Sequence, residues 1–397
     1  MKLRPVVQGD EKKILGWRND PVTRANSFTT REITAREHSE WFRKAIAPDS
    51  LKKIFLIEEE GAEVGVAALN LRGRIALVDV NIAPEHRGKG VGTKAVEIAC
   101  EKARELGLYR VDAEIKQENA ASIRTFEKTG FSVVWKGEVE KEGKKIPALK
   151  MSKRVGGKIV AVIQARAGST RLPGKVLKEI GGKSMLARVV ERVKQAKNVD
   201  EVVVATTAKK ADLAVADAAE KAGAKVFFGS EEDVLERYLG AGKEFGADVI
   251  VRITSDCPFV EPKVVDEVVE KYLETGADYA SNVVKRSFPR GLDAEVFSIE
   301  ALEKAAREAR KQEDREHVTL YIREHPNEFK AVDVEARGAL HRPELRLTVD
   351  EEKDLELARK IVNGLGEENL SAEKIIAFLD SHPEIKRIND GVKQKEK

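Results

Sequence analysis

The most chemically distinctive stretch of the sequence is QARAGSTRLPGKVL, residues 164–177, which directly follows a run of apolar residues. Three cations, Arg166, Arg171 and Lys175, alternate there with small and turn-forming residues. Cationic side chains neutralise phosphate groups, and the small residues Gly168 and Ser169 let the backbone approach them closely. A charge run is usually a solvated surface, but this one stands at the carboxyl end of a predicted buried strand. The pattern therefore predicts a phosphate-binding loop.

Two aspartates follow other apolar runs, Asp256 in RITSDCP and Asp350 in RLTVDEE. Magnesium usually takes one or two carboxylates together with phosphate oxygens and water, so aspartates at strand ends predict a Mg²⁺ site. Each has a structural alternative. Asp256 could cap a helix or turn before Pro258, and Asp350 could cap the helix that carries Leu355.

Three further charged residues are candidates for the same site. Asp293 and Glu295 in RGLDAEVF alternate along a predicted strand, so they point to one face, where they would meet an acceptor or a second metal, or else pair with Arg290. Arg237 in DVLERY would lie in a nucleotide pocket or on an ordinary helix surface.

Other motifs predict no P-loop, zinc site or disulfide. The GGKS segment at 181–184 has Leu177 where a P-loop requires glycine, so it predicts a hairpin turn that leads into a helix. Cys100 and Cys257 form no CxxC spacing, which favours a reducing cytosol. The histidines show no zinc-ligand spacing, and we expect a packed or capping role for His317 in REHVT.

A second glycine-rich loop, RGKGVG at 87–92, lies between an apolar strand and an amphipathic helix. Glycines let the backbone wrap an anion, and the amides at a helix start are donors with a favourable dipole. The alternative is a simple tight turn.

The elements around these loops predict two domains of α/β class. Before residue 153 we expect a mixed fold, with helices at 36–47 and 121–129, strands at 53–58, 63–71 and 109–115, and a strand, loop and helix over 75–106. After the polar segment KRVGGK, continuous apolar strands alternate with helices, which predicts a mainly parallel sheet covered on both faces. The predicted parts are a first domain at 1–155, a second at 156–390 and a charged tail at 391–397.

Composition agrees with two globular cores. The chain has 397 residues, of which 42% are hydrophobic, and its 71 Lys and Arg nearly balance 68 Asp and Glu. A formal charge of +3 argues against a dedicated nucleic-acid binder, and no segment predicts a signal peptide or membrane span. We expect a cytoplasmic protein, and its abundant Lys and Glu with scarce Gln favour growth at high temperature.

Residues 1–152 resemble the Gcn5-related N-acetyltransferase (GNAT) superfamily. The resemblance is carried by the loop at 87–92, by Asn119 and by the pair Gly130 and Phe131. The resemblance implies acetyl-CoA as a ligand, its pantetheine alongside Val80 to Ile82 and Asn119 near its far arm. Its pyrophosphate would lie on the amides of Arg87, Gly88, Lys89, Gly90, Val91 and Gly92. The opening WRNDPVTRANSFTTREITAREHSEWF is similar to a subgroup that includes the pseudaminic-acid and ribosomal-protein acetyltransferases, which favours an amine acceptor.

The sequence departs from that superfamily at one position. Many members have a tyrosine that protonates the departing thiolate where this chain has Phe126, and phenylalanine cannot donate a proton. Catalysis would then depend on proximity and on another acid or water, or the domain only binds a ligand. Asp79 and Glu114, on flanking strands, are candidate bases, although exposed carboxylates are more often not catalytic.

Most of residues 158–365 resembles the cytidylyltransferases that activate acidic sugars, nearest to the spore coat polysaccharide biosynthesis protein F group. The motifs that carry this likeness are QARAGSTRLPGK, VVVATT, GSEEDVLERY, RITSDCPFV, FPRGLDAEVF, REHVT and LRLTVDEEKDLELAR. It implies a nucleotide-diphospho-sugar transferase fold with CTP as co-substrate and Mg²⁺ on Asp256 and Asp350. The implied nucleotide contacts are Gln164, Ala165, Arg166, Gly168, Ser169, Arg171, Lys175 and Arg237. Arg171, Lys175 and Asp256 would be catalytic, and Asp293 and Glu295 would bind substrate.

The leading hypothesis is a bifunctional enzyme, expected as a homodimer, that acetylates an amino sugar and transfers CMP to an acidic sugar. A second hypothesis keeps the cytidylyltransferase and makes the first domain a ligand-binding or dimer-forming module, as Phe126 suggests. A third is glycosyl transfer from a nucleotide sugar, since such transferases share a similar α/β architecture. The cationic loop around Arg171 favours a triphosphate over a nucleotide-sugar diphosphate.

Overall fold

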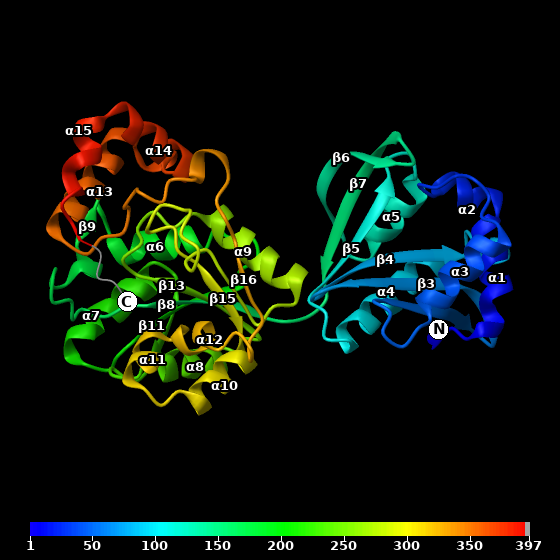
Figure 1. Ribbon diagram of the computed structural model, residues 1–397, viewed down its shortest axis with the longest axis horizontal. Helices are drawn as coiled ribbons and strands as arrows, with labels where there is room; N and C mark the ends of the chain where they lie inside the picture. The colour runs from blue at the N-terminus through cyan, green and yellow to red at the C-terminus, as the bar shows by residue number, and fades with distance from the viewer. Residues whose placement is uncertain (394–397) are drawn as a thin grey trace. The chain divides into compact units, whose positions relative to one another are not determined.

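The computed structural model describes residues 1–393 (Figure 1). The chain divides into two compact units, of which the first is Met1–Gly157 and the second begins at Lys158. The α/β class predicted from the sequence is confirmed in both. No helix within residues 1–393 is long and apolar enough to cross a bilayer.

A seven-stranded sheet in the order β1-β2-β3-β4-β5-β7-β6 forms the centre of the first domain. Its strands are β1 (Lys2–Pro5), β2 (Lys52–Glu59), β3 (Ala62–Arg72), β4 (Ile75–Ile82), β5 (Arg110–Lys116), β6 (Ser132–Lys141) and β7 (Lys144–Arg154). The helices are α1 (Glu11–Asn19), α2 (Pro21–Asn26), α3 (Ala35–Ala45), α4 (Val91–Glu105) and α5 (Ala120–Lys128). Apolar residues of α4 and α5 pack on one face of the sheet, and those of α1 and α3 pack on the other.

The strands β4 and β5 separate partway along their length. They are parallel neighbours, but their register runs only from the pair Ile75 and Arg110 to the pair Leu77 and Asp112. Both strands continue beyond that point, and β5 remains paired with β7 to its end at Lys116. A wedge therefore opens between the second halves of β4 and β5.

The second domain has a seven-stranded sheet in the order β12-β11-β8-β13-β15-β14-β16. Its strands are β8 (Ile159–Gln164), β11 (Glu201–Thr206), β12 (Lys225–Phe228), β13 (Val249–Thr254), β14 (Tyr279–Ser281), β15 (Glu295–Ser298) and β16 (Ala331–Asp333). The strands β12, β11, β8 and β13 are parallel, and β15 is antiparallel to both of its neighbours. Residues of β8 and β13 are almost entirely buried, as a sheet covered on both faces requires.

Ten helices within the described residues accompany this sheet. They are α6 (Met185–Val193), α7 (Leu213–Lys221), α8 (Val234–Glu244), α9 (Pro262–Thr275), α10 (Ile299–Glu308), α11 (Gln312–His317), α12 (Leu320–Glu324), α13 (Glu352–Leu365), α14 (Ala372–Ser381) and α15 (Pro383–Lys386). The predicted hairpin at GGKS is confirmed, because β9 (Glu179–Ile180) and β10 (Lys183–Ser184) pair across Gly181 and Gly182 before α6 begins.

The segment KRVGGK is less of a linker than its polar composition predicts. Lys153 and Arg154 are the last residues of β7 and pair with β5. Val155 is buried in the core of the first domain. Gly157 has a φ of +71°, and a Cβ there would lie 1.9 Å from the ring of Tyr109. The ordered fold of the first domain therefore extends to residue 157.

Candidate functional site

The second domain contains a polar cavity of about 1650 Å³ at the carboxyl ends of β8 and β13. Its wall includes the residues that the sequence predicted for this site: Gln164, Ala165, Arg166, Gly168, Ser169, Arg171, Lys175, Arg237, Asp256, Asp293, Glu295 and Asp350. Segments that are 186 positions apart in the chain thus meet at one edge of the sheet, where ligands of open α/β sheets usually bind.

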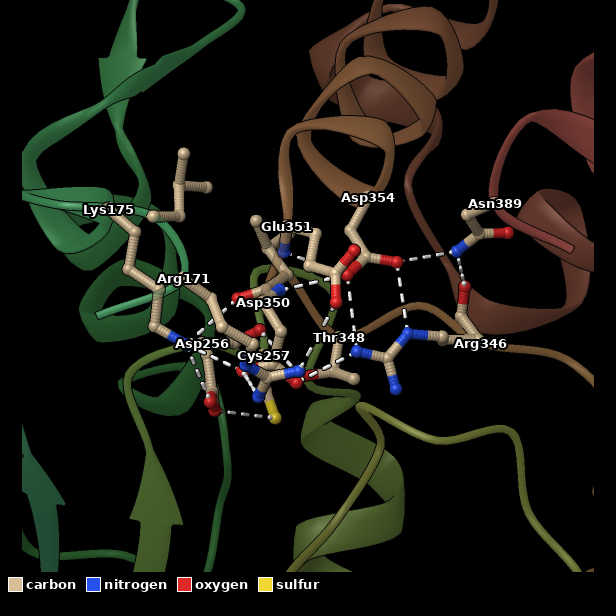
Figure 2. Close-up of polar contacts among 12 residues, drawn as sticks. Arg171, Lys175, Asp256, Cys257, Arg346, Thr348, Asp350, Glu351, Asp354 and Asn389 are labelled. Atoms are coloured by element: carbon tan, nitrogen blue, oxygen red, sulfur yellow. Dashed lines mark hydrogen bonds and ion pairs between the residues drawn. The ribbon is translucent and has the colours of Figure 1, made fainter. Parts of the chain in front are cut away.

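Lys175 joins the two predicted metal-binding aspartates (Figure 2). Its Nζ lies 3.0 Å from Asp256 Oδ2 and 2.9 Å from Asp350 Oδ1, and it also donates to the carbonyl of Val349 at 2.9 Å. The backbone keeps the two aspartates together, since the amide of Val349 donates to the carbonyl of Asp256 at 2.8 Å. The structure thus brings a lysine and two carboxylates to a single point.

Lys175 and Asp256 are partly buried, and the opposite charges around each of them keep both ionised. Burial lowers the pKa of Lys175, but the charges of Asp256 and Asp350 raise it above its ordinary value. Burial raises the pKa of Asp256, but the charge of Lys175 and hydrogen bonds from Thr254 and Lys175 lower it to about 2. Lys175 and Asp256 are therefore both ionised at neutral pH. Only 13% of the Lys175 side chain is exposed, so this loop cation is largely buried.

Cations surround Asp350 on two sides. Its Oδ1 contacts Lys175 and the Arg171 guanidinium at 2.8 Å, and its Oδ2 accepts a hydrogen bond from Arg346 at 2.8 Å. Its side chain does not cap α13. The N-cap of α13 is Glu351, whose amide donates to Asp354 Oδ2 at 3.1 Å, and the amide of Asp350 donates to the same oxygen at 3.0 Å. The carboxylate of Asp350 therefore faces the cavity and the loop.

A second layer of polar contacts fixes Arg346 behind Asp350 (Figure 2). Arg346 Nε donates to Asp354 Oδ1 at 3.0 Å, and Asn389 Nδ2 donates to the same oxygen at 2.8 Å. Burial raises the pKa of Asp354, but Arg346 and Asn389 lower it below its usual range. Asn389 comes from the end of the described chain, where the sequence offered no signal for a role at the site.

The cationic loop is anchored from beneath by Asp212. One carboxylate oxygen of Asp212 accepts the amide of Ala167 at 2.6 Å, and the other accepts the hydroxyl of Thr207. The amide of Gly174 closes the loop on the carbonyl of Ala167 at 3.1 Å. Arg166 is exposed and, within the described chain, its guanidinium has no protein partner. The loop is therefore shaped by the protein while its cations face the cavity.

The carboxylate of Glu295 belongs to a buried hydrogen-bond network. The carboxylate accepts hydrogen bonds from Arg252, from the hydroxyl of Tyr279 at 2.7 Å and from that of Thr319 at 2.5 Å. Arg252 also donates to Gln164 Oε1 at 3.2 Å. Burial raises the pKa of Glu295, but Arg252 and Thr319 lower it. Glu295 thus ties three strands together beneath the cavity.

The structure distinguishes between the alternatives that the sequence left open for Asp293 and Arg237. Asp293 pairs with Arg286 at 2.5 Å, rather than with the neighbouring arginine of its own motif. Arg237 on α8 is 2% exposed and lines the cavity, so it does not lie on an ordinary helix surface. Its guanidinium donates to the carbonyl of Ser230, and burial lowers its pKa.

Three cavity residues were not predicted to line this site: Arg290 was offered only as an ion-pair partner of Asp293 or Glu295, His317 only as a packed or capping residue, and Arg323 was not singled out. Arg290 has no protein hydrogen bond from its guanidinium within the described residues, and burial lowers its pKa. Arg323 and His317 also line the cavity. The motifs RGLD and REHVT contained Arg290 and His317, so the resemblance carried by these motifs was the signal that could have found both residues. His317 precedes Val318, whose φ of +61° is unusual for a β-branched residue and has no sequence signal.

The first domain contains a separate cavity of about 1110 Å³ at the wedge between β4 and β5. The glycine loop forms one end of it. Gly88 and Gly90 have φ values of +74° and +80°, and Gly90 is the N-cap of α4. Within the described backbone, the amides of residues 88–92 donate to no protein acceptor. These amides and the helix start form an anion-binding surface.

Side chains of this loop hold its shape. The guanidinium of Arg87 donates to the carbonyl of Ile82 at 3.0 Å, to Asp20 at 2.6 Å and to the hydroxyl of Thr23 at 2.8 Å. Lys89 donates to a backbone carbonyl at 2.9 Å. Arg87 therefore links the loop to the start of α2, and the backbone is left to face a ligand.

The remaining predicted cofactor contacts divide into two groups. Val80 and Ile82 line the cavity with Arg87, Gly88, Gly90 and Gly92. Lys89, Val91 and Asn119 lie outside its described wall. Val91 packs in the core, and the Asn119 side chain caps α5 by accepting the amide of Ser122 at 3.1 Å.

Phe126 lies at the position where many acetyltransferases have tyrosine, and its ring belongs to the core. It is 6% exposed and packs edge-on against Phe131, with 4.9 Å between ring centroids. Asp79 and Glu114 both line the cavity. Desolvation raises the pKa of Asp79, although the charge of Lys52 and a hydrogen bond from Asn70 act against it.

Comparison with known proteins agrees with this two-part architecture. A family model described as Cytidylyltransferase matches residues 160–380, and one described as Acetyltransferase (GNAT) domain matches residues 1–132. The uncharacterized protein MJ1063 of Methanocaldococcus jannaschii is 43% identical over 238 residues, which cover 60% of this chain and 97% of that protein. The spore coat polysaccharide biosynthesis protein SpsF of Bacillus subtilis is 37% identical over 232 residues, 57% of this chain and 95% of that protein.

A solved structure is similar to the same part of the chain. This cytidylyltransferase from Leptospira borgpetersenii serovar Hardjo-bovis is 32% identical and matches with a TM-score of 0.56. The match covers 61% of this chain and 100% of the Leptospira chain.

Proposed function

Because the chain belongs to the cytidylyltransferase family and carries a GNAT acetyltransferase domain ahead of that region, we propose that its second domain transfers CMP from CTP to an acidic, nonulosonate-like sugar. The observation that carries this proposal is the cluster of Lys175 with Asp256 and Asp350 beside the cationic loop. Such a cluster suits a triphosphate, because it combines cations for phosphate oxygens with carboxylates for a hard metal ion.

Magnesium fits the donor set of this cluster. Asp256 and Asp350 supply hard oxygen ligands, and no group of three or more His, Cys, Asp or Glu side chains able to hold a metal occurs within residues 1–393. A cation held by two carboxylates would take its other ligands from phosphate and water, as Mg²⁺ prefers. When bound there, the ion would neutralise charge on the phosphates.

The chain's own residues would position the reactants. Arg166 and Arg171 would hold the phosphates, with the loop shape fixed in advance by Asp212. Lys175 would stabilise charge on the phosphoryl group or the departing pyrophosphate. Arg290 and Arg323, which line the same cavity, favour an acceptor that carries a carboxylate. Transfer then consists of an acceptor hydroxyl oxygen bonding to the α-phosphorus while the bond to pyrophosphate breaks.

Pyrophosphate release tests the proposal. The full chain is incubated with Mg²⁺, each of the four nucleoside triphosphates and a panel of acidic and neutral sugars. We expect release with CTP and an acidic sugar only. If no triphosphate raises the melting temperature while a UDP-sugar does, glycosyl transfer replaces this proposal.

For the first domain we propose acetyl transfer from acetyl-CoA to the amine of an amino sugar. The unpartnered amides of residues 88–92 support the binding of the cofactor's pyrophosphate, and the wedge between β4 and β5 gives an acyl group access to the sheet. A second candidate, a module that binds the cofactor without turnover, is favoured by Phe126. Thiol release from acetyl-CoA with an amino-sugar panel separates them, because the module would bind acetyl-CoA and release no thiol.

A further inference from the structure

The cavity of the first domain extends well past the glycine loop, into a half lined by charged side chains. Asp79 of β4 and Glu114 of β5 form its floor. If the register of β4 and β5 continued beyond Leu77 and Asp112, these two residues would be opposite each other, two positions further along each strand. They lie on the same face of the sheet, on either side of the wedge.

Asp79 is an exposed carboxylate on the cavity wall with few protein partners. Within the described chain it accepts one hydrogen bond, from Asn70 Nδ2 at 3.2 Å, and forms no ion pair. Glu114 has one cation near it, Lys150 at 3.5 Å. Desolvation raises the pKa of Asp79, and the charge of Glu114 adds a smaller effect in the same direction. Two adjacent carboxylates with so few partners suit a positively charged group of a ligand.

The opposite wall carries buried nitrogens without partners. Arg18 of α1 donates from one terminal nitrogen to the carbonyl of Thr29 at 2.9 Å, whereas its Nη1 is buried and has no hydrogen-bond partner. His38 of α3 is 3% exposed, and neither of its ring nitrogens has a partner. Buried polar groups are nearly always satisfied, so these three nitrogens together point to groups supplied by a ligand.

Two other cations in the same half of the cavity, Arg31 and Lys52, already contact side chains of the protein. Arg31 forms a two-bond ion pair with Glu37 at 2.9 and 3.1 Å. Lys52 lies over the ring of Trp41, 5.0 Å from its centroid. The Trp41 ring is 38% exposed and offers an apolar wall beside the charged groups. Arg18, by contrast, has a buried guanidinium nitrogen that is available to bind an anion.

We propose that the acceptor bound here is an amino sugar that also carries an anionic group, with its amine at Asp79 and Glu114 and its carboxylate or phosphate at Arg18. This inference rests on the proposed acetyl transfer and narrows its substrate class. Neutral His38 would bond to a sugar hydroxyl, since burial lowers its pKa. The Trp41 ring would cover the apolar face of the sugar.

Matched pairs of acceptors test this placement in the full-length chain. Thiol release from acetyl-CoA is measured with glucosamine, glucosamine 6-phosphate and 2-amino-2-deoxyglucuronic acid, so that the two last arms distinguish phosphate from carboxylate. A short peptide with a free N-terminus is the fourth arm. We expect kcat/KM at least tenfold higher for one of the anionic amino sugars than for glucosamine.

Variants assign the preference to named residues. Arg18→Gln should lower kcat/KM for the anionic amino sugar at least tenfold more than it lowers kcat/KM for glucosamine, whereas Arg18→Lys should keep most of the preference. Asp79→Asn should weaken the use of both amines. Arg36→Gln is the matched control, because Arg36 is 90% exposed on α3 and pairs only with Glu40 in the described structure.

The outcomes separate two failures. If acetyl-CoA does not raise the melting temperature of the chain, the proposed acetyl transfer itself fails. If acetyl-CoA binds but neither anionic amino sugar is preferred, or no amino sugar is acetylated, this inference is overturned while cofactor binding stands. Faster acetylation of the peptide than of every amino sugar also overturns it, and assigns the cavity to a protein substrate. Retained preference in Arg18→Gln would remove Arg18 from the site.

Discussion

Each domain has a loop after a central strand that we expect to meet phosphate groups, and the two loops use different donors. In the loop at 87–92, the amides of a helix start face the cavity while the Arg87 side chain is committed to the protein. In the loop at 164–175, the backbone is tied down by Asp212, and Arg166, Arg171 and Lys175 face the cavity. One loop offers backbone dipoles and the other offers side-chain charge.

This difference has consequences for substitution. Backbone amides do not change when a side chain is replaced, so the first loop should depend on its glycines and on its shape. Side-chain cations can be removed singly, so the second loop should lose function one residue at a time. Its cations also need opposing carboxylates in the absence of ligand, and Asp256 and Asp350 provide them.

The largest expected effect comes from those carboxylates. Asp350→Asn and Asp256→Asn should each lower Mg²⁺-dependent nucleotidyl transfer by about 10³-fold or more, because a neutral amide is a poor ligand for a hard cation. Pyrophosphate release measures the loss. The acetyl-CoA response of the first domain should not change in either variant. Full activity of Asp350→Asn would leave this residue with a structural role in pairing Lys175 and Arg346.

The buried network beneath the second cavity should show the next largest effect, on stability. Glu295→Gln leaves the Arg252 charge buried without its carboxylate, which should cost about 3 kcal/mol. For a domain of this size that corresponds to a melting temperature about 6–12 °C lower.

Asp293→Asn is the comparison for that variant. Its ion pair with Arg286 is partly exposed, so it should cost less than about 1 kcal/mol. Equal losses in the two variants, followed by thermal denaturation, would contradict the structural role of Glu295.

A direct comparison of the two loops is the third test. Arg171→Ala should lower kcat/KM for CTP by about 10²-fold, because it removes a donor to a developing negative charge. Lys89→Ala should leave the affinity for acetyl-CoA within about twofold, since Lys89 donates to a backbone carbonyl outside the cavity. Lys221→Ala, on the exposed surface of α7, controls for loss of a cation in the second domain. A large effect of Lys89→Ala would break the contrast between the loops.

The sequence predicted the two domains' classes, the order of the main strands and the grouping of the site motifs at strand ends. Such features follow from apolar periodicity and from local turn residues. The sequence did not predict which acidic side chains would form ion pairs with cations of the protein itself. The ion pairs of Asp350 with Lys175 and of Glu295 with Arg252 could not be predicted, because these partners are distant in sequence.

Some structural features of the first domain could not be predicted because their sequence patterns are weak or depend on tertiary contacts. The short helices α1 and α2 have weak amphipathic patterns, and the strand end at Arg154 looks like a polar linker because its side chains face outward. The unpartnered nitrogens of Arg18 and His38 arise only when two helices and a sheet are assembled.

Glycine substitutions give a smaller contrast. Gly90 and Gly174 both have positive φ, +80° and +66°, and a Cβ at either would meet nothing within 4 Å. Alanine at each position should therefore cost about 1 kcal/mol through backbone conformation alone. Gly90→Ala should weaken acetyl-CoA binding because it moves the donor amides, and Gly174→Ala should affect CTP use less, since side chains carry that loop's charge. Calorimetry and pyrophosphate release measure the two, and the reverse order would contradict the assignment of donors.

The smallest effect should follow from separating the domains. Residues 1–157 and 158–397, expressed apart, should each fold, the first with a melting temperature raised by acetyl-CoA and the second with one raised by CTP and Mg²⁺. The cut lies after Gly157 because Gly156 packs against Leu108 and Gly157 against the ring of Tyr109. Lys158 begins the second domain by donating from its amide to Asp248 at 2.5 Å. A first fragment that ends at residue 155 should melt slightly lower, because it loses the cover over Tyr109. Folded fragments whose ligand responses are exchanged or absent would refute the division of labour between the two loops.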